Sequence, residues 1–83
     1  MQHRYLVIVE HAGDNYSAYA PDVPGCVSAG DTIEETLRNF QEALQMHLEG
    51  TFEDGDPAPH PYSVHAAFVE ANVEMPAPTA QAS

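Results

Sequence analysis

Residues 16–35 constrain the fold more than any other part of the chain, because they join a strand, a corner, a second strand and a helix start. The two strands are predicted at 16–20 and 26–29, on either side of the corner. In the corner, two prolines remove backbone donors and a glycine permits a positive φ, at Pro21, Pro24 and Gly25. The segment therefore predicts a small module in which a sheet leads directly into a helix.

An apolar run at residues 5–9, rich in branched side chains, precedes this segment and predicts an earlier strand. Turn-forming residues lie between this run and the strand at 16–20, at Gly13, Asp14 and Asn15. The two strands are therefore expected to form a β-hairpin. Together with the strand at 26–29 they make a three-stranded meander.

A long amphipathic helix is predicted next. Its N-terminus is expected at Asp31 or Thr32, because each is followed three residues later by a glutamate, the pattern of a capping box. Large apolar side chains then recur at helical spacing, at Ile33, Leu37, Phe40, Leu44, Leu48 and Phe52. This stripe places Gly50 inside the helix and makes Gly55 the expected terminator.

Proline-rich residues 56–61 predict an extended linker, and a fourth strand is expected at about residues 63–70. A right-handed crossover through the helix would place that strand parallel to the first strand and beside it. We therefore predict an α+β fold with the order β-β-β-α-β. Its mixed four-stranded sheet would have the strand order 3-2-1-4, with one long helix on one face.

The first predicted strand is apolar on both faces, since residues 5, 7 and 9 point to one side and residues 6 and 8 to the other. One helix covers only one face of a sheet. Strands that are apolar on both sides are usually buried on both sides. We therefore expect a homo-oligomer that forms through the uncovered sheet face.

The chain carries 13 acidic residues and 2 basic ones, which gives a formal net charge of -11. Such a charge repels nucleic-acid backbones and attracts basic proteins over long distances. We therefore expect a basic protein partner and no direct binding of nucleic acid. Residues 5–9 are too short for a membrane span, and Cys26 has no disulfide partner, so a cytoplasmic protein without membrane contact is expected.

A chain of 83 residues has apolar material for one core only. We therefore expect a single domain over residues 1–75. Residues 76–83 consist of proline and other small or polar side chains, which predicts a disordered tail.

No constellation for catalysis or metal binding stands out. A two-metal nuclease site could be drawn from Glu10, a helical glutamate and Glu70, but Glu10 lies at the outer end of its strand. The five histidines form no HxH or HxxxH pair, and Cys26 has no CxxC mate. We therefore expect no catalytic residue, no metal and no cofactor, and predict that the protein is not an enzyme.

Four motifs of this sequence occur together in one known family: the strand at 5–10, the corner at 21–26, the helix start at 30–35 and the helix end at 47–55. In this combination the chain resembles the N-terminal domain of the HicB antitoxins. The resemblance implies a partial RNase H-like fold and a role in a type II toxin-antitoxin system. The implied partner is a HicA-type toxin, a small basic ribonuclease that cleaves mRNA. Fuller-length members append a DNA-binding segment, whereas no basic or amphipathic stretch follows Val73, so no C-terminal DNA-binding domain is expected.

An antitoxin of this kind would occlude the RNA-binding surface of the toxin. Charge would steer the encounter, and buried apolar or aromatic anchors would supply most of the affinity. Contacts are therefore expected around the corner and on the helix, at Tyr16, Tyr19, Asp22, Val23, Glu34, Glu42 and Glu49. The alternative hypothesis is a free-standing HicB-like oligomer that serves as a scaffold or ligand-binding module without a toxin partner. In that case Asp22 would only shape the turn and the glutamates would form a solvated face.

Overall fold

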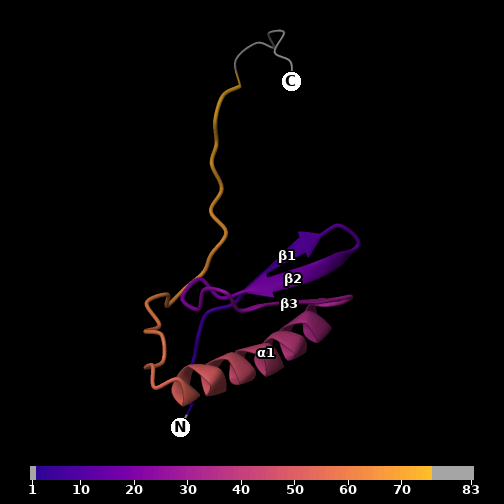
Figure 1. Cartoon of the computed structure of the whole chain (residues 1–83). Helices are drawn as coiled ribbons and strands as arrows, with labels where there is room; N and C mark the ends of the chain where they lie inside the picture. Colours follow the sequence, from indigo (N-terminus) through magenta and orange to yellow (C-terminus); the bar gives the residue numbers. More distant parts are fainter. Residues whose placement is uncertain (1, 76–83) are drawn as a thin grey trace.

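The computed structural model describes residues 2–75, and the predicted tail at 76–83 lies outside the described residues. Three antiparallel strands, β1 (Ile8–Ala12), β2 (Asn15–Tyr19) and β3 (Val27–Gly30), pair in the order β1-β2-β3. The helix α1 (Ile33–Glu53) lies against one face of this sheet (Figure 1). The predicted α+β class, hairpin, corner and long helix are thereby confirmed. The first strand begins later than predicted, because residues 4–7 are extended but have no partner strand among the described residues.

The core forms between the sheet and α1. Val9 pairs with Ala18, and Ala18 with Ser28, so these three positions share the face that α1 covers. Phe40 from α1 is 2% exposed and is the largest fully buried side chain. It packs with small residues of the sheet and corner, at Ala18, Ala20, Val23 and Cys26.

Both ends of α1 are fixed by local hydrogen bonds. The Thr32 hydroxyl accepts a bond of 3.0 Å from the Glu35 backbone N–H, which identifies Thr32 as the N-cap. The Glu35 carboxylate in turn accepts from the backbone N–H of Asp31 at 3.0 Å. At the other end Gly55 has a φ of 81° and donates to the carbonyl of Phe52, while Gly50 lies inside the helix. The predicted positions of both glycines are confirmed.

The predicted fourth strand at 63–70, and with it the four-stranded order 3-2-1-4, is not formed among the described residues. Between the end of α1 and residue 75 the chain has no regular structure, and from about residue 64 it runs out from the body on the side of the sheet opposite α1 (Figure 1). The physical reason is that a strand exists only when a neighbouring strand supplies its hydrogen bonds. No strand within residues 2–75 pairs with this segment.

Candidate partner-binding surface

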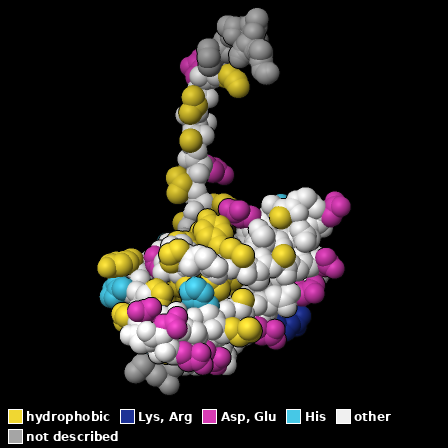
Figure 2. Space-filling view, viewed as in Figure 1, with side chains coloured by type: hydrophobic (Ala, Val, Ile, Leu, Met, Phe, Trp, Pro, Cys, Tyr) yellow, Lys and Arg dark blue, Asp and Glu magenta, His cyan; other side chains and the backbone are white. Residues whose placement is uncertain are grey.

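The acidic residues predicted on the helix lie on its outer side. Glu34, Glu42 and Glu49 are all exposed. At about 100° per residue, Glu42 and Glu49 lie within about 20° of each other around the helix axis, on the side opposite Phe40. They are separated by about 10 Å along the axis. Figure 2 shows acidic side chains gathered along this edge of the molecule, with little basic surface among them.

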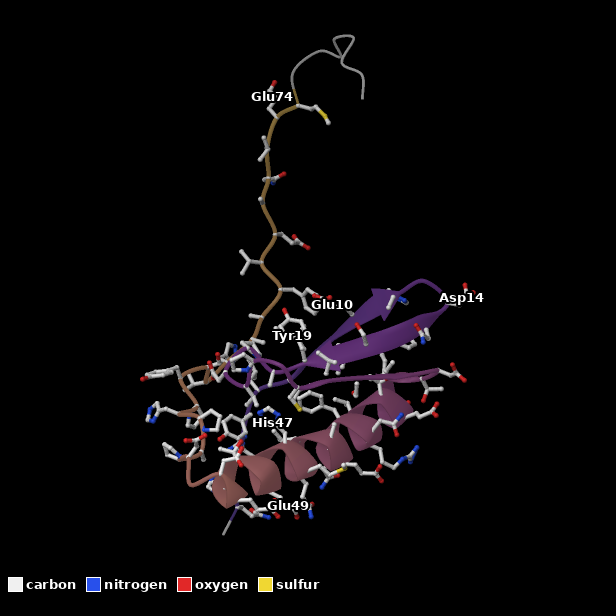
Figure 3. All side chains as sticks on the ribbon, in the orientation of Figure 1. Glu10, Asp14, Tyr19, His47, Glu49 and Glu74 are labelled. Carbon is white, nitrogen blue, oxygen red and sulfur yellow. The ribbon has the colours of Figure 1, made fainter. Side chains whose placement is uncertain are left out.

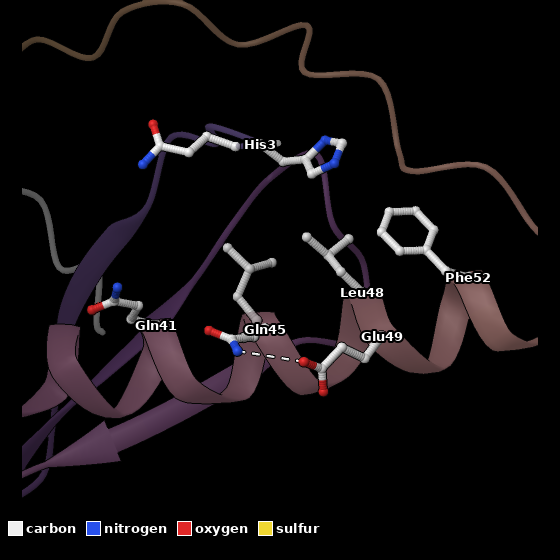
Figure 4. A pocket seen from close by; sticks show the side chains of 8 residues that line it. His3, Gln41, Gln45, Leu48, Glu49 and Phe52 are labelled. Atoms are coloured by element: carbon white, nitrogen blue, oxygen red, sulfur yellow. Dashed lines mark hydrogen bonds between the residues drawn. The ribbon is translucent and has the colours of Figure 1, made fainter.

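A shallow pocket of about 420 Å³ lies beside this acidic surface, between α1 and the N-terminal residues 2–3. Its apolar walls come from Leu44, Leu48 and Phe52, and Glu49 stands at its rim (Figure 4). Glu49 accepts a hydrogen bond of 3.4 Å from the amide nitrogen of Gln45. The pocket therefore combines apolar walls with a carboxylate, which suits a partner side chain that has an apolar stem and a basic end.

The aromatic ring of His3 closes one end of this pocket. Its centroid lies 5.6 Å from that of Phe52, with the ring planes tilted by 49°. Phe52 nevertheless stays 46% exposed. A large aromatic side chain that is half uncovered beside a carboxylate is the kind of residue that anchors an interface.

Further apolar side chains of α1 are also uncovered, at Ile33, Leu37 and Met46. Ile33 and Leu37 belong to the apolar stripe that the sequence predicts on this helix, yet they are 47% and 42% exposed. The helix lies mainly over β3, and a three-stranded sheet is too narrow to cover the whole stripe. The stripe is therefore longer than one small sheet can bury.

Tyr16 and Tyr19 do not form one surface. Tyr16 is half-buried on the helix-covered face, where its ring lies 4.8 Å from that of His11 with the planes tilted by 35°. Tyr19 lies on the uncovered face, on the same side of the sheet as Glu10 (Figure 3). It pairs with Ile8 on one side and Val27 on the other, so these three residues form an apolar row across the sheet.

Val23 and Asp22, the two corner residues predicted to contact the partner, make their contacts within the domain. Val23 is 1% exposed and belongs to the core, so its side chain supports the corner from within. The Asp22 carboxylate accepts bonds from the backbone N–H of Ser63 at 2.7 Å and from its hydroxyl at 3.2 Å. Asp22 therefore joins the corner to the linker, a connection that spans 41 residues of sequence.

A second bond holds the same linker. The Tyr5 hydroxyl donates to the carbonyl of Pro59 at 2.7 Å. Burial raises the pKa of Tyr5 above its usual value of 10.0, and the negative charge of Asp22 raises it further. The phenol is therefore a neutral donor at ordinary pH. Burial likewise raises the pKa of the Cys26 thiol, which lies in the core and has little thiolate character.

Among residues 2–75, no three histidine, cysteine, aspartate or glutamate side chains converge to hold a metal ion. The carboxylates considered for a nuclease site, Glu10, a helical glutamate and Glu70, form no such group. Within the same residues, α1 is too polar to cross a membrane.

Known proteins with similar sequences belong to a family of antitoxins. A family model described as the HicB-like antitoxin of bacterial toxin-antitoxin systems matches residues 5–77. Antitoxin HicB 2 of Photorhabdus laumondii is 39% identical over 67 residues, which cover 81% of this chain and 48% of that protein. A second curated relative, from Haemophilus phage HP1, is covered over 41% of its length, so the chain spans about half or less of these two relatives.

Two solved structures share the fold. One is a HicA3 and HicB3 toxin-antitoxin complex, with a TM-score of 0.63 and 30% identity, covering 72% of this chain and 70% of the other. The other is the N-terminal domain of the antitoxin HicB from Burkholderia pseudomallei, with a TM-score of 0.61 and 32% identity. Here the match covers 70% of this chain and 69% of the other. The sheet and helix described above are thus similar to those of two antitoxins at recognisable sequence identity.

Proposed function

Since this chain belongs to the HicB-like antitoxin family of bacterial toxin-antitoxin systems, we propose that it neutralises a small basic HicA-type ribonuclease by occluding the surface with which that toxin binds RNA. The antitoxin acts by binding and performs no chemistry. The relative solved in complex with a HicA3 toxin supports the class of partner. The observation that carries the proposal is the acidic outer side of α1 beside an apolar pocket.

The two parts of this surface have different roles in binding. With a net charge of -11, the antitoxin attracts a basic toxin and speeds the encounter. Exposed ion pairs contribute only about 0 to 1 kcal/mol each, so Glu42 and Glu49 orient the toxin more than they hold it. Burial of Phe52 and the walls of the pocket supplies most of the binding free energy.

Of the residues predicted at the corner, Tyr19 is the one whose side chain remains available on the uncovered sheet face. That face also carries Ile8 and Val27 in register with it. The chain self-associates through this apolar row, which leaves the acidic side of α1 free for the toxin. Tyr16, Asp22 and Val23 then act by shaping the domain, because their side chains already have partners within it.

The proposal is tested with the product of the neighbouring gene, where that gene encodes a short basic protein. Expression of that protein alone should arrest growth, and co-expression of the antitoxin should restore it. The purified pair should bind more weakly as the salt concentration rises, with residual binding from the apolar contact. A neighbour that neither arrests growth nor binds the chain would overturn the antitoxin role and favour a free-standing HicB-like scaffold.

A charge-reversal pair locates the surface. The double substitution Glu42→Lys and Glu49→Lys should weaken toxin binding by about 10-fold or more near physiological salt, because it turns two attractions into repulsions. The single reversal Glu49→Lys is compared with Asp14→Lys as its matched control, since Asp14 is exposed at the hairpin turn, far from Glu49 (Figure 3). Equal binding by Glu49→Lys and Asp14→Lys would exclude the outer side of α1 as the toxin surface.

A further inference from the structure

The segment 64–75 is the least explained part of the chain. It is extended, and every one of its residues is exposed. Its large apolar side chains, at Val64, Phe68, Val69, Val73 and Met75, have no cover within the described residues. No glycine or proline interrupts the sequence from 62 to 75, and the strand-favouring residues valine and phenylalanine recur at positions 64, 68, 69 and 73.

The root of this segment is fixed to the domain. The bond from Tyr5 to Pro59 and the two bonds from Ser63 to Asp22 hold the linker in place. A second pocket, of about 460 Å³, is lined by residues 4–7 together with Pro61, Ser63 and Val64. The root therefore lies beside the chain that leads into β1, at the point where a strand parallel to β1 would begin.

The outer edge of β1 has no partner among residues 2–75, since the sheet order is β1-β2-β3. An unpaired edge presents a row of free backbone donors and acceptors that another strand can satisfy. The segment begins beside this edge and then runs away from the sheet on the side opposite α1 (Figure 1), where the Tyr19 side chain lies (Figure 3). The described residues thus contain both an extended segment without a pairing partner and a sheet edge without a pairing partner.

We propose that two copies exchange these segments, each segment 64–73 pairing as a fourth strand with the free edge of β1 in the other copy. The exchange rests on the self-association proposed above, and it does not depend on the toxin. It completes the sheet through the second copy and brings the two uncovered faces, with Ile8, Tyr19 and Val27, toward each other. Such reciprocal exchange is a closed two-fold arrangement that needs no further partner.

The alternation of side chains fits a strand that is covered on both sides. Val64, Ala66 and Phe68 point to one face of the extended segment, which ends in the polar residues Glu70 and Asn72. The other face carries Ala67, Val69, Ala71 and Val73. A strand beside β1 would have the second copy on one side. On the other side it would widen the sheet, which in three strands is too narrow to cover the apolar stripe of α1. The apolar part of each face is thereby covered, as strands with this pattern require.

The distribution of charge favours a second copy over a basic protein as the occupant. Only two of the 13 acidic residues, Glu70 and Glu74, lie beyond Asp56. The segment is therefore the part of the chain that is least repelled by another copy with a charge of -11, and the part that attracts a basic toxin least. A toxin is drawn instead to the acidic side of α1.

Cross-linking between differently tagged copies tests the exchange. In a Cys26→Ser background, one copy carries Ala12→Cys at the end of β1 and the other carries Glu70→Cys. Both positions are exposed, and neither is an apolar anchor of the segment. After co-expression and purification through both tags, a short bis-maleimide should join the two copies into one covalent dimer. Glu42→Cys replaces Ala12→Cys in the control pair and should give no such product.

The outcomes separate this inference from the proposed function. A covalent dimer between the tagged copies supports exchange, whereas light scattering of a dimer without that product overturns exchange and leaves self-association standing. A further variant carries both cysteines, at positions 12 and 70, in one chain. If cross-linking occurs only within that chain and never between copies, the segment folds back onto its own β1, which also overturns exchange. A strict monomer near 9.0 kDa overturns both exchange and self-association, and toxin binding is assayed independently of each result.

A substitution gives a second test. Phe68→Asp should weaken dimerisation by about 100-fold or more, because it places a charge where an aromatic side chain is buried. The single copy should fold normally, since Phe68 touches nothing within it. Dimerisation should also hold or strengthen as the salt concentration rises, which is the reverse of the toxin interaction. A Phe68→Asp variant that dimerises as tightly as the original chain would overturn the exchange.

Discussion

Gly30 is the last residue of β3 and lies close against α1. Among the glycines of the chain, it is the one at which an added side chain would meet neighbouring atoms. A Cβ atom at this position would lie 2.8 Å from both the backbone nitrogen and the hydroxyl oxygen of Thr36. Thr36 has no freedom to withdraw. It is 0% exposed, its backbone N–H and hydroxyl both donate to the Thr32 carbonyl, and its own carbonyl accepts from the Ser28 hydroxyl.

Gly30→Ala should therefore destabilise the domain. Overpacking of this kind costs about 1 to 3 kcal/mol. Alanine restricts the unfolded chain more than glycine, and this effect offsets about 0.4 to 1 kcal/mol of the cost. The net loss is at most about 2.6 kcal/mol and is centred on about 1.3 kcal/mol, which corresponds to a melting temperature lower by about 5 to 10 °C for a domain of this size.

Gly50→Ala is the matched control. Gly50 lies inside α1, and a Cβ there would meet nothing within 4 Å. The same chemical change should now stabilise the domain by up to about 1 kcal/mol, because alanine favours the helix. Thermal and urea unfolding followed by circular dichroism, at one protein concentration, measures both variants. A Gly30→Ala variant as stable as the original chain would show that β3 and α1 are not in the tight contact described here.

Three further perturbations follow from the same contacts. Phe40→Ala should cost about 3 to 5 kcal/mol of unfolding free energy in urea, and a loss below about 1 kcal/mol would mean that Phe40 is not the centre of the core. Asp22→Ala should speed amide hydrogen exchange at residues 57–63, because it removes the bonds from Ser63 that hold the linker. Asp56→Ala changes an exposed aspartate and is the control. Unchanged exchange in Asp22→Ala would show that the bonds to Ser63 do not hold the linker. Because the pKa of Tyr5 is raised in the folded chain, its stabilising contribution is present below about pH 10 and is lost as the pH rises through the folded pKa. The Tyr5→Phe variant should therefore lose less stability than the original chain between about pH 9 and pH 11.5, measured by urea unfolding. Both chains carry Cys26→Ala, because the pKa of the buried thiol is raised as well and would add its own pH dependence. Equal losses of stability with and without the phenol would refute this.

The sequence predicted those parts of the fold whose causes lie within a few residues of each other. The Thr32 cap is specified by Glu35 three residues later, and the end of α1 by the positive φ of Gly55. The corner with its glycine is similarly local. The predicted fourth strand is not formed among the described residues, because pairing depends on a neighbour and no local pattern specifies whether that neighbour belongs to the same copy.

For the candidate surface too, the features set by nearby residues could be predicted from the sequence, and those set by distant residues could not. The exposed position of Glu34, Glu42 and Glu49 follows from helical spacing, and the structure places all three on the outside of α1. The internal role of Asp22 could not be read from the sequence, because its partner Ser63 lies 41 residues away. The exposure of Phe52 depends on how much of the helix a small sheet covers, which becomes visible only once the elements are packed.

The layered arrangement allows the two proposed interactions to occur together. Glu42 and Glu49 point away from the sheet, whereas Tyr19 lies on the sheet face opposite α1, so the two surfaces are on opposite sides of the domain. A dimer formed through the sheet faces therefore leaves an acidic helix side exposed on each copy. Two basic toxins can bind such a dimer without competing, and the net charge of the antitoxin pair strengthens the attraction that each toxin experiences. A fixed ratio of one toxin to one chain, unchanged between monomer and dimer, is the stoichiometry that this geometry requires.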